Sequence, residues 1–301
     1  MDIKAVVDEV SKVVRGKEEV ILKALTCFLS GGHLLIEDVP GVGKTVLVLS
    51  LAKAMDLSFA RIQFTSDLLP SDITGNSIFD QSKRDFVFKE GPIFNHIVLA
   101  DEINRATPKT QSALLEAMAE GHVTIDGNTY HLPEPFFVVA TQNPVEHYGT
   151  YPLPESQLDR FAMKIAVGYP PQEVEREILM GANPITLIDE VRKVASVRDI
   201  MRAREEVKKV YISPEVADMI MDIVSRTRND PNIVLGVSTR GALHFAQCAR
   251  ALAYIRERDF VVPEDVLEVA LPSLSHRIIT REESGGEEVI KSILSEVKVP
   301  R

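Results

Sequence analysis

The chain contains 301 residues, of which 45% are hydrophobic and 26% are charged, and its formal net charge is −10 at pH 7. This composition is ordinary for a globular protein of about two domains, and no stretch approaches the roughly 18 uninterrupted apolar residues that a membrane helix needs. The acidic balance argues against broad binding to nucleic-acid phosphates, so we expect no membrane span and no nucleic-acid partner.

The amino terminus and the cysteines indicate the compartment. Met1-Asp-Ile-Lys4 lacks the basic start and the apolar core of an export signal. Cys27 and Cys248 lie far apart in the sequence, so they give no disulfide framework and no zinc site. We therefore expect a protein of the reducing cytoplasm.

The first thirty residues predict two helices. Apolar residues recur at helical spacing from Ile3 to Val14, and Arg15-Gly-Lys17 then interrupts the pattern. A second helix is expected from Val20 to Leu29, where Gly31-Gly32 supplies a stop signal. The segment between the two helices is an ordinary turn on this evidence alone.

The next segment, Asp38-Val-Pro-Gly-Val-Gly-Lys-Thr45, is typical of a loop that holds phosphates. It follows the apolar run 34–36, which predicts a short buried strand, and precedes the apolar run 46–52, which predicts a helix. Strand, glycine-rich turn and helix form the context that a phosphate loop requires. The general pattern has glycine where Asp38 stands, so only its second half matches. A glycine turn beside a surface lysine is the alternative.

Each residue type in this loop suits a nucleoside triphosphate. Glycines let backbone N–H groups come close to phosphate oxygens. Lys44 would reach the β- and γ-phosphates, and the Thr45 hydroxyl would ligate Mg²⁺. The helix N-terminus adds its dipole. We expect the nucleotide to contact Pro40, Gly41, Val42, Gly43, Lys44, Thr45 and Val46.

Two hairpins are expected outside the main alternation of strands and helices. Residues 75–92 contain two short β-like runs around the polar turn 80–84. Residues 122–132 contain two more, with Asp126-Gly127 at the tip. Surface decoration is the alternative to a functional role, because hairpin loops are common on any surface.

An acid pair follows the apolar run 97–100. Asp101 and Glu102 stand at the carboxyl end of a predicted parallel strand, which is where α/β sheets bind ligands. Asp101 can hold the Mg²⁺ shell, and Glu102 can polarise a water for attack on the γ-phosphate. A strand end followed by a helix cap is the alternative, but the phosphate loop upstream favours the catalytic interpretation.

A third strand, 136–141, leads to Asn143, whose side-chain amide can orient the attacking water. The alternative is that Asn143-Pro144 only starts a turn. With further strands expected at 59–64 and 163–167, the sequence predicts a five-stranded parallel sheet covered by helices on both faces.

The remainder predicts a separate helical region. Tyr169-Pro-Pro171 ends the α/β pattern, so we place an α/β domain over residues 1–170 and a small all-helical domain over 171–301. Helices are expected after Ser213 and Ser238, which are good N-cap residues. We expect no strand in this second domain.

Three strands thus end in polar groups: the phosphate loop, the acid pair and Asn143. In this order they resemble the strand ends of the AAA+ ATPases, and the similarity is closest to the MoxR type. The matching motifs are Glu37-Asp-Val-Pro-Gly-Val-Gly-Lys-Thr45, Ala100-Asp-Glu-Ile-Asn-Arg-Ala106, Ala140-Thr-Gln-Asn-Pro144 and Leu153-Pro-Glu-Ser-Gln-Leu-Asp-Arg-Phe161. The resemblance runs from about Val14 to about Arg277. It implies a P-loop AAA+ sheet domain followed by a helical lid, and Asp38 is usual in that family.

The resemblance also assigns roles to residues outside these strand ends. Val14 and Gly16 would line the adenine pocket. Arg240 would be a second sensor of the γ-phosphate, either of its own subunit or of a neighbour. Arg160 matches the position from which an arginine finger enters the adjacent subunit's site, and Arg105 is a further interface candidate. A local carboxylate is the alternative partner for Arg160 and Arg240.

As a member of this family the protein would form a ring, hexameric by resemblance, and use ATP and Mg²⁺ to remodel or mature a protein client. Proteins with von Willebrand factor A domains are the partners that the family suggests, and the two hairpins would face the channel of the ring. One alternative is a motor subunit of a metal-chelatase-like complex or a DNA-acting relative. Another is a nucleotide-gated binding module with little turnover, against which the intact Glu102 and Asn143 argue.

Overall fold

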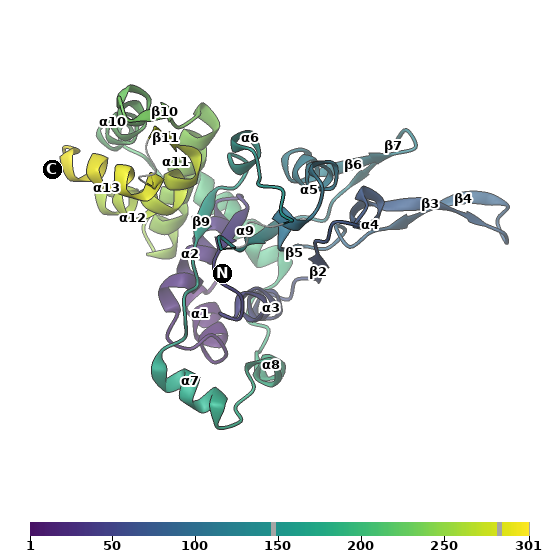
Figure 1. Ribbon diagram of the computed structural model, residues 1–301. Coiled ribbons are helices and arrows are strands. Elements are labelled where there is room, and N and C mark those ends of the chain that lie inside the picture. The colour runs from purple at the N-terminus through teal and green to yellow at the C-terminus, as the bar shows by residue number, and fades with distance from the viewer. Residues whose placement is uncertain (146–148, 282–284, 301) are drawn as a thin grey trace. The chain divides into compact units, whose positions relative to one another are not determined.

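The computed structural model describes residues 1–145, 149–281 and 285–300. The chain, traced in Figure 1, divides into two compact units. Unit 1 comprises Met1–Ile21, Leu35–Leu153 and Ala166–Ile200, and unit 2 comprises Leu22–Leu34, Pro154–Ile165 and Met201–Arg301. The domain boundary at residue 170 stays a prediction. Within the described residues, no helix is long and apolar enough to span a membrane.

A five-stranded sheet with the order β2-β5-β8-β1-β9 forms the centre of the fold, as the sequence predicts. Its strands are β1 Leu34–Glu37, β2 Phe59–Gln63, β5 Ile97–Asp101, β8 Phe137–Gln142 and β9 Met163–Ile165. β5 is buried along its whole length. Helices cover both faces of such sheets, so a central strand has no solvent-facing side and its residues are apolar without interruption. β2 and β8 pair with β5 in parallel register. The carboxyl ends of these three strands therefore meet at one edge.

One group of helices belongs to unit 1. They are α1 Ile3–Ser11, α3 Lys44–Ala54, α4 Pro70–Thr74, η1 Ile103–Arg105, α5 Pro108–Glu120, α7 Gln172–Leu179, α8 Pro184–Leu187 and η2 Ile188–Glu190. α1 packs on α3, which is apolar along most of its length and is largely buried. Helix α1 ends at Ser11, and the apolar Val13 and Val14 continue the pattern in a buried turn.

Both predicted hairpins are present and project from unit 1, as Figure 1 shows. β3 Gly75–Asp80 pairs with β4 Asp85–Glu90, and β6 His122–Ile125 pairs with β7 Asn128–His131. The Phe88 ring of the first hairpin stacks on the Tyr130 ring of the second, with their centroids 4.1 Å apart. The two hairpins are therefore in contact with each other.

Unit 2 is mainly helical. Its helices are α6 Glu155–Leu158, α10 Pro214–Asn229, α11 Thr239–Ile255, α12 Pro263–Leu274, η3 Ser275–Arg277 and α13 Gly286–Glu296, and α2 Glu18–Leu29 and α9 Val197–Lys209 each have residues in both units. The predicted caps are confirmed: the Ser213 hydroxyl accepts a bond from the Val216 amide, and that of Ser238 from the Gly241 amide.

One detail of the second domain differs from expectation. β10 Ile233–Leu235 and β11 Ile279–Thr280 form a short antiparallel pair, although we expected no strand after residue 170. Each strand is too short to show an alternating pattern, and its partner lies far away in the sequence. Pairing of this kind depends on the tertiary fold and leaves no local signal.

Candidate functional site

The loop between β1 and α3 has the backbone shape that close contact with an anion requires. Gly41 and Gly43 have φ angles of 85° and 91°, which lie in a backbone region that residues with a Cβ atom rarely adopt. A Cβ atom added at either glycine would meet nothing within 4 Å, so the space beside the loop is open. Gly43 caps α3 without a side-chain hydrogen bond, which leaves the first N–H groups of the helix for another acceptor.

Lys44, the first residue of α3, is held against this loop. Its Nζ atom donates to the backbone carbonyls of Asp38 at 2.7 Å and Val39 at 3.2 Å. An ammonium group has three donors, so one N–H remains for a further acceptor. Burial lowers the pKa of Lys44, and the nearby Asp38, Asp101 and Glu102 carboxylates oppose that shift. The loop therefore presents a partly buried cation beside the glycines.

Asp101 ends β5 and is bound from two sides. Its Oδ1 atom accepts a 2.6 Å hydrogen bond from the hydroxyl of Thr141, a fully buried residue on β8. Its Oδ2 atom accepts from the Arg61 guanidinium on β2, at 2.5 Å from the nearer nitrogen. Strands β2 and β8 lie on either side of β5, so they bring Arg61 and Thr141 to the two sides of Asp101. The Asp101 carboxylate is thus fixed in place, and it already attracts a cation.

Glu102 has an unusual backbone conformation. With φ 56° and ψ 48° it lies in the left-handed region, which costs on the order of 1–3 kcal/mol for such a residue. Its amide donates to the Thr141 hydroxyl at 2.8 Å, so Thr141 fixes both members of the acid pair. Its carboxylate accepts from the Gln63 amide at 2.8 Å and pairs with Arg105 at 3.1 Å. These contacts hold the Glu102 side chain at the edge of the sheet.

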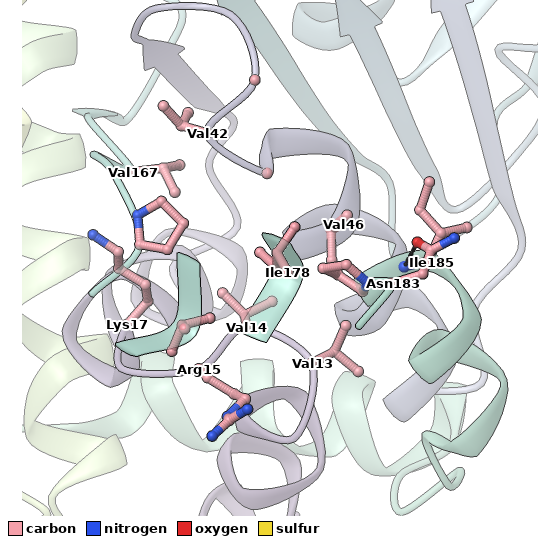
Figure 2. Close-up of a pocket in the computed structure, with 15 residues that line it drawn as sticks. Val13, Val14, Arg15, Lys17, Val42, Val46, Val167, Ile178, Asn183 and Ile185 are labelled. Atoms are coloured by element: carbon pink, nitrogen blue, oxygen red, sulfur yellow. Dashed lines mark hydrogen bonds between the residues drawn. The ribbon is translucent and has the colours of Figure 1, made fainter. Parts of the chain in front are cut away.

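Two cavities meet at the loop. A polar cavity of about 370 Å³ is lined by Pro40, Gly41, Gly43, Lys44, Thr45, Val46, Arg61, Gln63, Asp101, Glu102, Gln142 and Asn143. A second cavity of about 270 Å³, shown in Figure 2, is mainly apolar and shares Gly41, Gly43 and Val46 with the first. A charged space and an apolar space therefore lie on either side of the same glycines.

The apolar cavity contains only part of the predicted adenine contacts. Val14 and Val42 line it, as Figure 2 shows. Gly16 is not among its lining residues; a Cβ atom there would lie 2.5 Å from Pro171 Cγ. The rest of the wall includes Ile178 on α7 and Ile185 on α8. Both residues lie beyond the expected domain boundary at residue 170, and neither was predicted to contact a ligand.

Asn143 follows β8 and lines the polar cavity. Its Oδ1 atom accepts a 3.1 Å hydrogen bond from the Val145 amide, so the residue also starts the turn that was the alternative interpretation. The two interpretations are compatible, because the side-chain amide nitrogen is a separate donor.

The two predicted active arginines outside the loop belong to unit 2. Arg240 lies in the first turn of α11, and its NH1 atom is 3.9 Å from Oδ2 of Asp159. Arg160 directly follows Asp159, and its amide donates to the Gln157 carbonyl at 3.1 Å. Arg240 is thus close to a carboxylate of its own unit, and Arg160 is the next residue along the chain after that carboxylate.

Three polar residues of the site were not predicted from the sequence. They are Arg61, Gln63 and Thr141, which bind the acid pair. A signal existed for Gln63, which stands near the carboxyl end of the predicted strand 59–64, and Arg61 lies two residues before it in the same strand. Thr141 lies inside a quoted motif, but its position between the two acids depends on the pairing of β5 with β8.

A sheet with a phosphate loop after β1 and an acid pair after β5, together with a helical second unit, defines a P-loop ATPase of the AAA+ class. Comparisons with known proteins agree. The family described as "ATPase family associated with various cellular activities (AAA)" matches residues 33–163, and the family described as "AAA lid domain" matches residues 225–297.

Full-length similarities identify the family. The chain is 46% identical to YeaC, an uncharacterised protein of Bacillus subtilis, over 98% of this chain and 93% of that protein. It is 42% identical to the chaperone MoxR1 of Mycobacterium tuberculosis, over 97% of this chain and 81% of that protein. A crystal structure from Cytophaga hutchinsonii, provisionally described as an ATPase, has a TM-score of 0.90 and 44% identity and covers 100% of this chain and 95% of its own. The chain therefore belongs to the MoxR-type AAA+ ATPases.

Proposed function

We propose that this ATPase binds ATP with the base in the apolar cavity and the phosphates in the polar cavity, and that it uses hydrolysis to remodel a protein client. One observation carries the proposal: the two cavities share Gly41, Gly43 and Val46. A nucleotide needs an apolar space for its base and a charged space for its phosphates, and a loop of N–H groups between them fits the junction.

The loop residues Pro40 to Val46 would bind the phosphates through backbone N–H groups, and Lys44 would add a charge. Its present acceptors are backbone carbonyls, which a phosphate oxygen can replace with a stronger, charge-assisted bond. Val14, with the walls from α7 and the segment after it, would exclude water from the base.

Thr45 and Asp101 would hold Mg²⁺. Both line the polar cavity, and both supply the hard oxygen ligands that this ion prefers. The Arg61 guanidinium beside Asp101 supports the assignment, because the carboxylate already binds a positive charge. When bound, the ion would neutralise charge on the phosphate oxygens.

Glu102 would accept a proton from the attacking water, and Asn143 would orient that water. Both line the cavity that contains Lys44. Gln63 and Arg105 bind the Glu102 carboxylate, so proton transfer requires these contacts to loosen. In a ring, Arg160 would act on the nucleotide of the adjacent subunit, and Arg240 would sense the γ-phosphate.

The wider setting is also part of the proposal. A hexameric ring in the cytoplasm, hairpins that contact the client, and partners with von Willebrand factor A domains follow from the family resemblance. The similarity to a named chaperone, MoxR1, supports a protein client over a chelatase or DNA-acting role.

The test separates binding from chemistry. Lys44→Ala should abolish binding of a fluorescent ATP analogue, whereas Glu102→Gln should bind it normally and release phosphate at a small fraction of the normal rate. Lys291→Ala, which changes an exposed lysine of α13, is the matched control and should behave as wild type. Normal turnover by Glu102→Gln would refute the assignment of the base, and negligible turnover by the wild-type ring would favour a nucleotide-gated binding module.

A further inference from the structure

Arg277, the last residue of η3, is an arginine whose side chain is completely buried. Its Nε atom donates to the Ser273 carbonyl at 2.7 Å. Its NH1 atom donates to the carbonyl of Asp159 at 2.8 Å, and its NH2 atom donates to the carbonyl of Phe161. The planar guanidinium therefore binds the peptide carbonyls on both sides of Arg160.

The same guanidinium forms an ion pair with the Asp159 side chain. That carboxylate also accepts from the Ser238 hydroxyl, at 3.0 Å and 2.9 Å from its two oxygens. Ser238 in turn caps α11 by accepting from the Gly241 amide. Asp159 thus connects the residue before Arg160 to the helix start that carries Arg240, which approaches the same carboxylate.

Close packing restricts this arrangement. A Cβ atom at Gly241 would lie 3.0 Å from Cδ of Arg277, so the first turn of α11 packs directly on the arginine. His276, the preceding residue, places its Nε2 atom 2.9 Å from the Phe161 carbonyl. The backbone that follows Arg160 is therefore held by two neighbouring side chains of η3.

Burial of a guanidinium is expensive in free energy even when it is paired, and apolar side chains often stabilise such a position equally well. Stability alone is therefore a weak explanation for Arg277. A planar group with several fixed donors is instead suited to hold carbonyl and carboxylate oxygens in one geometry.

We propose that the Asp159–Arg277 pair is a positioning device that fixes Arg160 and Arg240 relative to each other, so that both arginines act on the phosphate charge as one unit. The inference rests on the proposed roles of those two arginines. Asp159 and Arg277 would not touch the nucleotide; they would act through the residues that they hold.

A double-mutant cycle in the full-length protein tests the proposal. Arg277→Lys keeps the charge but cannot span two carbonyls. It should lower kcat by about tenfold or more while the affinity for a fluorescent ATP analogue changes less than about twofold, because only the transition-state contact is lost. In an Arg160→Ala background the same substitution should lower kcat by a smaller factor, because one of the two arginines that it positions is already gone, and in an Arg160→Ala/Arg240→Ala background by less than about twofold.

Three outcomes overturn the inference. A folded Arg277→Lys variant with normal kcat would show that the geometry at Arg160 does not depend on the Arg277 guanidinium. An equal loss of kcat with and without Arg160 would show a general structural role. Should Arg160→Ala itself retain full kcat, the proposed finger role fails and this inference fails with it. If Arg160→Ala is inactive and Arg277→Lys lowers kcat by the same factor in both backgrounds, the finger role of Arg160 stands and only the positioning role of Arg277 is refuted.

A second variant, at Ser238, changes a smaller side chain and should disturb folding less. Ser238→Ala removes the hydroxyl from Asp159 and should lower kcat, and Ser238→Thr should restore it. The matched control is Ser213→Ala, which removes the same kind of cap from α10. It should unfold at a lower urea concentration than wild type and keep its kcat. Equal losses of kcat in both alanine variants would mean that cap stability, not contact with Asp159, is responsible, and would overturn the proposal.

Discussion

The Asp38 carboxylate accepts two backbone hydrogen bonds through Oδ2, from the amide of Val167 at 2.8 Å and from that of Gly168 at 2.6 Å. Asp38 stands where the general phosphate-loop pattern has glycine. The contact ties the start of the loop to the segment before α7, and Val167 and Pro170 of this segment line the apolar cavity. Asp38, the residue that departs from the pattern, therefore connects the phosphate loop to the wall of the proposed base site through these hydrogen bonds.

Asp38→Gly should weaken ATP binding by about tenfold or more, because two hydrogen bonds to a charged group are lost. Binding of tripolyphosphate, which has no base, should change much less. Competition against a fluorescent nucleotide measures both affinities, and Asp189→Gly, at an exposed carboxylate of the same unit, is the control. Equal weakening of both ligands would mean that Asp38 only shapes the phosphate loop.

Thr141→Val should impair hydrolysis more than ATP binding. The substitution preserves shape but leaves the Glu102 amide without its acceptor and Asp101 without its donor, which costs about 1–3 kcal/mol for each buried group. Phosphate release measures hydrolysis, competition against a fluorescent nucleotide measures ATP binding, and urea unfolding measures the loss of stability. Thr141→Ser retains the hydroxyl and should stay close to wild type; if serine and valine are equally impaired, the hydroxyl is not the cause.

Arg61→Ala should lower the Mg²⁺ concentration needed for tight ATP binding, because the guanidinium competes for the Asp101 carboxylate. We expect a shift of about threefold to tenfold, within the range of 0.5–1.5 kcal/mol typical of one net hydrogen bond. Titration of Mg²⁺ at fixed nucleotide gives the midpoint, and Arg198→Ala is an exposed control. A midpoint that moves to higher Mg²⁺ would instead make Arg61 part of the binding site for the complex.

Mixing two inactive variants tests the ring. Arg160→Ala should bind ATP almost normally and hydrolyse it on the order of 10³-fold more slowly, the loss seen when an arginine finger is removed. A mixture with Glu102→Gln should partly recover phosphate release, since one interface can combine an intact Glu102 with an intact Arg160. Mass spectrometry establishes whether mixed rings form. Mixed rings without activity would exclude a role for Arg160 across the subunit boundary.

Local signals in the sequence were sufficient for most of the fold. Uninterrupted apolar runs such as 97–100 indicated the strands of the sheet, because a strand covered on both faces has no polar side. The Asp126-Gly127 tip indicated a hairpin, and Ser213 and Ser238 indicated helix starts, because turns and caps depend on a few adjacent residues. The loop and the acid pair could likewise be placed at strand ends, while their chemical roles stay predictions.

Contacts between distant residues were decided only by the tertiary structure. The bonds from Asp38 to residues 167 and 168, from Thr141 to Asp101, and from Arg277 to Asp159 join segments that share no local pattern. The same holds for α7 beside Val14 and for the pairing of β10 with β11. Periodicity and capping report the conformation of neighbours along the chain. Which buried polar group meets which partner depends on how the elements pack, and each such group requires a partner once water is excluded.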